Sequence, residues 1–103
     1  MNFNTLLNTL PPIEDLVGLA IMDGETQIHY IPAIAGKLGS LRVYNALAEA
    51  FHGRLDRTSA QQGIQLFAEH SEDAKQHPGK HPNIDLLFQI IEQDLHYQLV
   101  PQK

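Results

Sequence analysis

The sequence has 103 residues, 43% of them hydrophobic and 18% charged, a composition typical of one globular domain over residues 1–103. Its 12 acidic and 7 basic residues give a formal net charge of −5 without any basic run that would neutralise phosphates, so we expect no nucleic-acid partner. The absence of cysteine excludes disulfides, thiolate metal sites and cysteine nucleophiles.

The first part of the chain predicts a short helix and then a β-hairpin. A helix over residues 2–10 has to end before Pro11, because the residue ahead of a proline is pushed out of the α region. Residues 16–22 and 26–31 read as two strands joined by a turn at Asp23-Gly24. The apolar run 16–22 is interrupted by Gly18 and is far too short for a membrane span.

The rest of the chain predicts three amphipathic helices, because apolar residues recur three and four positions apart. We expect Ser40 to be the N-cap of the first of these helices. The second begins with the capping-box spacing of Ser59 and Gln62 and runs to about His70. The third has Asn83 as its N-cap. Gly63 lies inside the second helix, where it costs about 1 kcal/mol relative to alanine, which indicates a close packing contact.

Two further strands complete the predicted sheet. Arg54-Leu55 fits a short strand between two helices, and the alternation of Leu95, Tyr97 and Leu99 predicts a final strand. The order of elements predicts an α+β fold, in which a small mixed sheet of three to four strands, the N-terminal hairpin among them, is packed on one face by three to four helices.

Two segments share the pattern Gly-Lys-x-x-[Ser/Asn]-[Leu/Ile], residues 36–41 and residues 79–84. This shared pattern fits either a decayed internal repeat or two helices that are capped independently. Each segment directly precedes a predicted helix, where unpaired backbone amides attract anions and the lysine adds a full positive charge. The spacing is not that of a nucleotide P-loop. A phosphate or carboxylate would fit here. The alternative is that glycine, serine and asparagine are present only because these residue types are common at helix N-termini.

The candidate ligand-binding residues come from these two loops and the neighbouring histidine. They are Lys37, Gly39, Ser40, His70, Gly79, Lys80, His81 and Asn83.

The histidines suggest a different chemistry. His70, His77 and His81 could bind a metal ion together with Glu72 or Asp73, although their spacing matches no motif with a known mechanism. His70 or His81, oriented by a carboxylate, could also act as a general base, with Glu69, Glu72 or Asp85 as the partner. A nucleophile is hard to nominate, because the position of Ser71 beside His70 in the sequence does not imply contact. We therefore nominate no catalytic residue and no cofactor.

Part of the sequence also resembles a known family. The segments that carry the resemblance are Leu66–Ala74, Pro78–Asp85, Gly39-Ser40-Leu41 before Tyr44, and Ala46-Leu47-Ala48. They resemble a family of small bacterial proteins classed as a domain of unknown function, and the resemblance covers nearly the whole chain. It implies a single domain, and it brings no activity, cofactor or partner with it.

Two hypotheses for function follow. The first is a non-catalytic binding or interaction module, cytoplasmic and without a membrane partner, that captures a small anionic ligand at the Gly-Lys loops or binds a protein partner. Homodimerisation could add to it, through the hairpin edge or the N-terminal helix. The alternative is a small enzyme or metal-binding protein that uses the loop with His70, His77 and His81. An anion site requires Lys37 and Lys80 on one face, whereas an enzyme requires His70, His81 and an acidic group together in a cleft.

Overall fold

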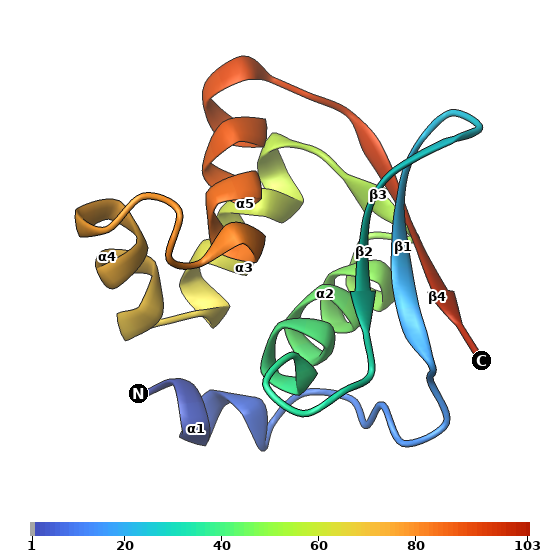
Figure 1. The fold of residues 1–103 in the computed structure, drawn as a ribbon, viewed down its shortest axis with the longest axis horizontal. Coiled ribbons are helices and arrows are strands. Elements are labelled where there is room, and N and C mark those ends of the chain that lie inside the picture. Colours follow the sequence, from blue (N-terminus) through green and yellow to red (C-terminus); the bar gives the residue numbers. More distant parts are fainter. Residues whose placement is uncertain (1) are drawn as a thin grey trace.

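The computed structural model describes residues 2–103, which form helices and strands in the order of Figure 1. The helices are α1 (Phe3–Leu7), α2 (Leu38–Ala50), α3 (Arg57–Leu66), α4 (Glu69–Gln76) and α5 (Pro82–Gln93). The strands are β1 (Gly18–Asp23), β2 (Thr26–Pro32), β3 (Arg54–Leu55) and β4 (Tyr97–Gln102).

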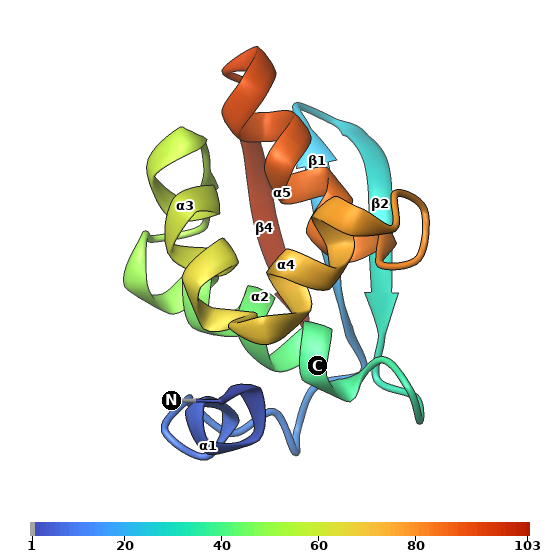
Figure 2. The ribbon, with the colours of Figure 1, turned by 90° about the vertical axis from the view of Figure 1, so that its left-hand side faces the viewer.

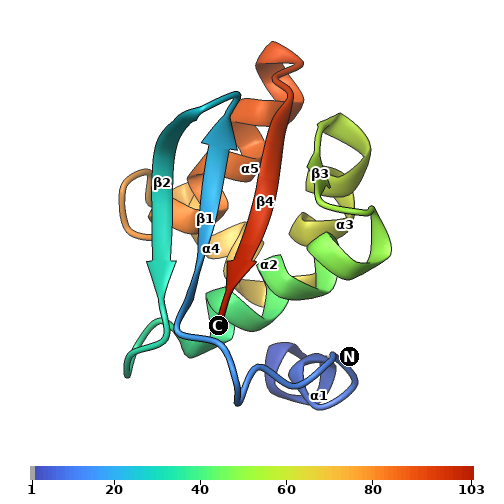
Figure 3. The same ribbon diagram turned by 90° about the vertical axis from the view of Figure 1, so that its right-hand side faces the viewer.

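The four strands form one sheet in the order β2-β1-β4-β3. The predicted hairpin is confirmed, since β1 pairs with β2, and the predicted short strand and final strand are confirmed as β3 and β4. All neighbouring pairs are antiparallel, so the expectation of a mixed sheet was wrong. Figure 3 shows the sheet from the side that faces away from α4 and α5, which lie behind it. The α+β class is confirmed.

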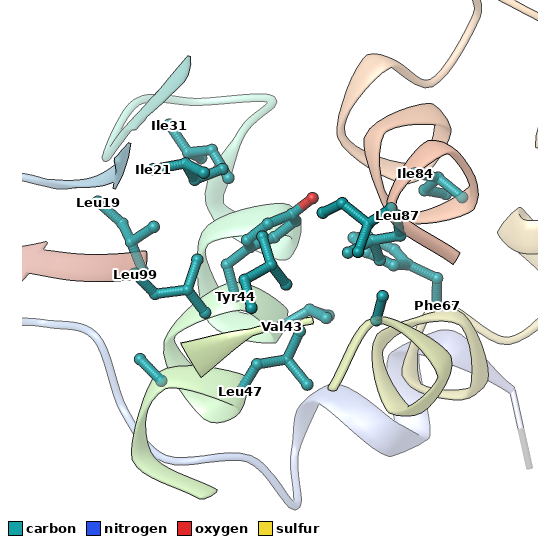
Figure 4. Packing of buried hydrophobic residues seen from close by; sticks show 14 of the residues in the cluster. Leu19, Ile21, Ile31, Val43, Tyr44, Leu47, Phe67, Ile84, Leu87 and Leu99 are labelled. Atoms are coloured by element: carbon teal, nitrogen blue, oxygen red, sulfur yellow. The ribbon is translucent and has the colours of Figure 1, made fainter. Parts of the chain in front are cut away.

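The core lies between the inner face of the sheet and the helices (Figure 4). Leu19, Ile21 and Leu99 contribute from the central strands, and Tyr44 and Leu87 meet them from α2 and α5. This arrangement follows from the two periodicities of the sequence, because alternate strand residues and every third or fourth helix residue face the same side. The core holds the first turns of α2 and α5 in place, and both contribute to the site described below.

Gly63 has the close packing contact that its place in a helix indicates. A Cβ atom built on Gly63 would lie 2.8 Å from Cδ1 of Leu87 and 3.0 Å from Cδ1 of Leu47. Helix α3 therefore approaches α2 and α5 at a point where a side chain on residue 63 requires Leu87 and Leu47 to shift.

The predicted helix starts were wrong by a few residues. Helix α2 has Lys37 as its N-cap and α5 has His81, with Pro82 in its first turn, so Ser40 and Asn83 lie inside their helices. Neither of these N-caps forms a side-chain capping hydrogen bond. In α3 the N-cap is Asp56, and Ser59 is the third helical residue of a reciprocal capping box.

The single helix expected up to about His70 is two helices, α3 and α4. The helical conformation is interrupted at Ala68, which has a φ of 52°. Ser71 of α4 then donates from Oγ to the carbonyl oxygen of Ile64 at 2.6 Å, which satisfies an acceptor at the end of α3. This break gives five helices where three to four were expected. No helix within residues 2–103 combines the length and the apolar character that crossing a bilayer requires.

Candidate functional site

A cleft of about 410 Å³ opens between α1, the first turns of α2 and α5, and the chain from Phe67 to His70. Figure 2 views the molecule from this side, with α1 and α4 in the foreground. The segments that line the cleft lie far apart in the sequence, so the fold brings them together.

Seven of the eight candidate residues line this one cleft. They are Lys37, Gly39, Ser40, His70, Lys80, His81 and Asn83. Gly79 lies beside the cleft and is not part of its wall. Its backbone N–H donates to Oδ2 of Asp85 at 2.9 Å, so this amide is engaged within the protein.

The α2 side of the cleft is built by residues 36–40. Gly36 has a φ of 87°, a conformation that glycine adopts without strain, and it turns the chain into the helix. The first backbone amides of an α-helix have no partner within the helix, and no side chain caps those of α2. Lys37 is exposed, and within residues 2–103 the ion pairs of lysine involve Lys75, Lys80 and Lys103 only.

The α5 side repeats part of this geometry. Gly79 has a φ of 92°, and the helix begins at Pro82. Asn83 is buried and is hydrogen-bonded to two other elements, β2 and α2. Nε2 of His29 donates to its Oδ1 at 2.6 Å, and the hydroxyl of Tyr44 donates to its backbone carbonyl oxygen at 2.6 Å. Burial raises the pKa of Tyr44, so the hydroxyl keeps its proton. These bonds fix the first turn of α5 against β2 and α2.

Asp73 of α4 is not part of the cleft wall, and its carboxylate contacts the basic side chains of the second Gly-Lys loop. Its Oδ2 accepts from Nε2 of His81 at 2.7 Å and lies 2.9 Å from Nζ of Lys80, and its Oδ1 is 3.7 Å from Nε2 of His77. The hydrogen bonds from His81 and Lys80 lower the pKa of Asp73 to about 2. Asp73 is therefore ionised and fixes the position of His81.

Four rings follow one another along the cleft, and we call them the ring row: Phe67, Phe3, His70 and His81. Phe3 stacks on Phe67 with centroids 5.8 Å apart, and it meets His70 edge-on at 4.8 Å. The His70 and His81 rings are 5.7 Å apart. The N–H of Phe3 donates to Oε1 of Glu69 at 2.8 Å, which fastens α1 to α4.

The arrangement that the anion hypothesis requires is present in this cleft, because Lys37 and Lys80 line it together. The arrangement that an enzyme requires is present only in part. His70 and His81 lie near each other in the wall, but Asp73, the carboxylate on His81, is not part of the wall. A metal site has less support, because residues 2–103 contain no group of three or more histidine, aspartate or glutamate side chains that could hold a metal ion. Within the same residues, no hydroxyl group is hydrogen-bonded to His70 or His81.

The apolar wall of the cleft was not foreseen. Phe3, Leu7, Phe67 and Ile84 line it, and each looks in the sequence like an ordinary member of an amphipathic helix. Gly36 was visible in the repeated Gly-Lys pattern and was not nominated. A sequence pattern gives no position for α1 relative to α2, so the contribution of Phe3 could not be predicted.

Comparison with known proteins gives one family. Residues 3–101 match the model of a family described as an uncharacterized protein conserved in bacteria (DUF2322). No curated protein and no solved structure matches the chain.

Proposed function

The chain belongs to the DUF2322 family of uncharacterized bacterial proteins, and we propose that it is a non-catalytic binding module for a small oxyanion, a phosphate or a carboxylate. The ligand binds in the cleft between the two Gly-Lys loops. One observation carries the proposal: the described wall of this cleft contains Lys37, Lys80, His70 and His81 and no carboxylate.

The carboxylates near the cleft support this assignment, because each is already engaged with a donor of the protein. Asp73 accepts from His81 and pairs with Lys80, Glu69 accepts from the N–H of Phe3, and Asp85 accepts from the N–H of Gly79. An entering anion therefore meets cationic side chains and helix amides first. The lysine ammonium has three donors, so Lys80 keeps two for a ligand.

The two helix starts add to the lysines. The first turns of α2 and α5 both contribute to the cleft wall, and the positive ends of two helix dipoles favour an anion more than one does. Neither helix has a side-chain cap. Helix α2 offers its first backbone amides, whereas α5 offers the amide of Asn83, because Pro82 has no N–H and the N–H of Ile84 donates to the carbonyl oxygen of His81. A cap would compete with the ligand for these donors.

Thermal unfolding in the presence of inorganic phosphate at pH 7 tests the proposal. At ten times the Kd, the ligand stabilises the folded state by about 1.4 kcal/mol, a rise in Tm of roughly 6 to 11 °C for a chain of this size. Lys37→Gln should lose most of this rise. Lys75→Gln changes an exposed lysine outside the cleft wall and should keep it.

The matched lysine variants are needed because phosphate stabilises many proteins as an excluded salt. A rise of equal size in Lys37→Gln and Lys75→Gln would mean this general effect and would contradict the proposal. A further variant, Asp73→Asn, tests the direction of the electrostatic effect on phosphate affinity. It removes the negative charge beside Lys80, so the affinity for phosphate should increase, and a decrease would also count against the proposal.

One observation favours an enzyme as the second candidate, namely the Asp73–His81 hydrogen bond of 2.7 Å beside the cleft. A carboxylate that orients an imidazole is an arrangement used in general base catalysis. Incubation with phenyl phosphate and phenyl acetate separates the two functions. A binding module releases no phenol above the background rate, whereas turnover that is lost in His81→Gln would replace the binding proposal with this one.

A further inference from the structure

We infer that the ligand of this cleft is an aryl oxyanion, a flat aromatic body that carries the phosphate or carboxylate group. This inference rests on the proposed function and adds the chemical class of the rest of the ligand. It comes from the ring row and from the close approach of Phe3 to the first turn of α2.

The volume of the cleft exceeds what a bare oxyanion fills. At about 410 Å³ it lies within the range of roughly 300 to 1,000 Å³ that is usual for sites of organic ligands. A phosphate ion occupies only a few water volumes of about 30 Å³ each, so most of the cleft would stay filled with water. Water against an apolar wall is unfavourable, and an apolar body that displaces it gains free energy.

The apolar part of the wall combines two aromatic rings, Phe3 and Phe67, with the aliphatic side chains of Leu7, Leu38, Pro82 and Ile84. The ring row runs from Phe67, which is almost fully buried, through the half-buried Phe3 to His70 and His81. Aromatic rings with centroids about 4.5 to 7 Å apart attract one another in stacked and edge-to-face geometries. A flat aromatic ligand in the cleft adds a further ring contact of this kind beside Phe3, His70 and His81.

The oxyanion end and the aromatic end of the cleft adjoin each other at Gly39. A Cβ atom built on this glycine would lie 3.2 Å from Cε2 and Cζ of Phe3 and 3.9 Å from Cδ1 of Leu7. The Phe3 ring therefore packs directly on the first turn of α2, beside Lys37 and Ser40 of the cleft wall. An aromatic ring joined directly to the anionic group, as in benzoate and phenyl phosphate, is the simplest body that can contact Phe3 while the anion is bound at this turn.

Isothermal titration of the wild-type protein with four probes tests this inference. The probes are inorganic phosphate, phenyl phosphate, acetate and benzoate. The aryl member of at least one pair should bind on the order of tenfold more tightly than its bare anion, as expected when part of a phenyl ring is buried. The pair that shows the gain also tells whether phosphate or carboxylate is the preferred head group.

Variants test whether the higher affinity of the aryl probe depends on the ring row. Phe3→Ala should bring the ratio of the two affinities within a pair, aryl probe to bare anion, close to one, whereas Lys37→Gln should weaken both probes of a pair and keep that ratio. Phe3→Leu keeps an apolar side chain to pack α1 and should lose only part of the preference. In the wild type, the methyl resonances of Leu7 and Ile84 should move with phenyl phosphate and stay in place with inorganic phosphate.

The possible failures are distinguishable. If the bare anions bind and the aryl probes gain nothing, or if the gain persists in Phe3→Ala with unmoved Leu7 and Ile84 methyl resonances, the aryl inference is overturned and the oxyanion site stands. If none of the four probes binds, the proposed function itself is overturned.

Discussion

Asp73 is the residue on which the positive side chains of the second Gly-Lys loop converge. His81, Lys80 and the more distant His77 all face its carboxylate, whose side chain is 32% exposed. The sequence suggested Asp73 only as a metal ligand. The structure gives it a different position, in which it holds His81 at the cleft and leaves Lys37 as the lysine of the cleft wall with no carboxylate partner in the described chain.

The lowered pKa of Asp73 predicts how this cluster contributes to acid stability. The folded pKa of about 2 lies below the ordinary 3.8, so the carboxylate stabilises the folded state at pH values above about 4. That contribution is lost as the pH falls towards 2. Urea unfolding of the wild type and Asp73→Asn between pH 5 and pH 2 should show a stability difference that is largest at pH 5 and falls to a small remainder at pH 2, where the folded carboxylate is half protonated.

A second carboxylate variant serves as the control for this titration. Asp15→Asn removes one exposed ion pair, with Lys103 at 3.2 Å, and should change stability little at any pH in the range. A difference between wild type and Asp73→Asn that grew on acidification would show that the assigned direction is wrong.

Among the elements, the strands and the amphipathic helices could be read from the sequence, and the helix ends could not. Alternation and 3.6-residue spacing report which face is buried, and this was enough to find β1, β2, α2 and α5. Whether a residue caps a helix depends on which other hydrogen-bond partners its side chain meets in the folded chain. The side chain of Asn83 bonds His29 across the fold instead of its own helix, and no local pattern reveals such a partner.

The break between α3 and α4 had no sequence signal either. Alanine is the best helix former, yet Ala68 takes a positive φ, and the Ser71 bond to the end of α3 compensates for it. The break turns α4 so that His70 meets Phe3 and His81. A continuous helix through residue 68 would not produce the ring row, so the cleft depends on the feature that propensity predicts least well.

Gly63 gives a prediction at the scale of helix packing. Alanine would favour the helix by about 1 kcal/mol, but its Cβ would lie too close to Leu87 and Leu47 in a fully packed core. Overpacking of this kind costs about 1 to 3 kcal/mol, so we expect Gly63→Ala to destabilise the protein by about 1 kcal/mol in urea unfolding. Gln61→Ala, on the exposed side of the same helix, should be close to neutral, and a Gly63→Ala variant more stable than the wild type would refute the packing argument.

For the whole molecule, the repeated Gly-Lys pattern marked two segments that line the same cleft. Both copies turn at a glycine with positive φ and both lead into a helix, although the N-cap falls on lysine in one copy and on histidine in the other. The sequence indicated that each loop can attract an anion. Their convergence on one cleft depends on how α2 and α5 pack across α3 and the sheet, which only the folded chain defines.

The most direct test of a shared oxyanion site is to follow backbone amide resonances during a titration with inorganic phosphate. If the two loops form one oxyanion site, the amides of Gly39 and Ser40 at α2 and of Asn83 at α5 should shift together and fit a single Kd, while those of the Asp23-Gly24 turn stay in place. Shifts in only one loop, or in both loops with different Kd values, would contradict a shared site.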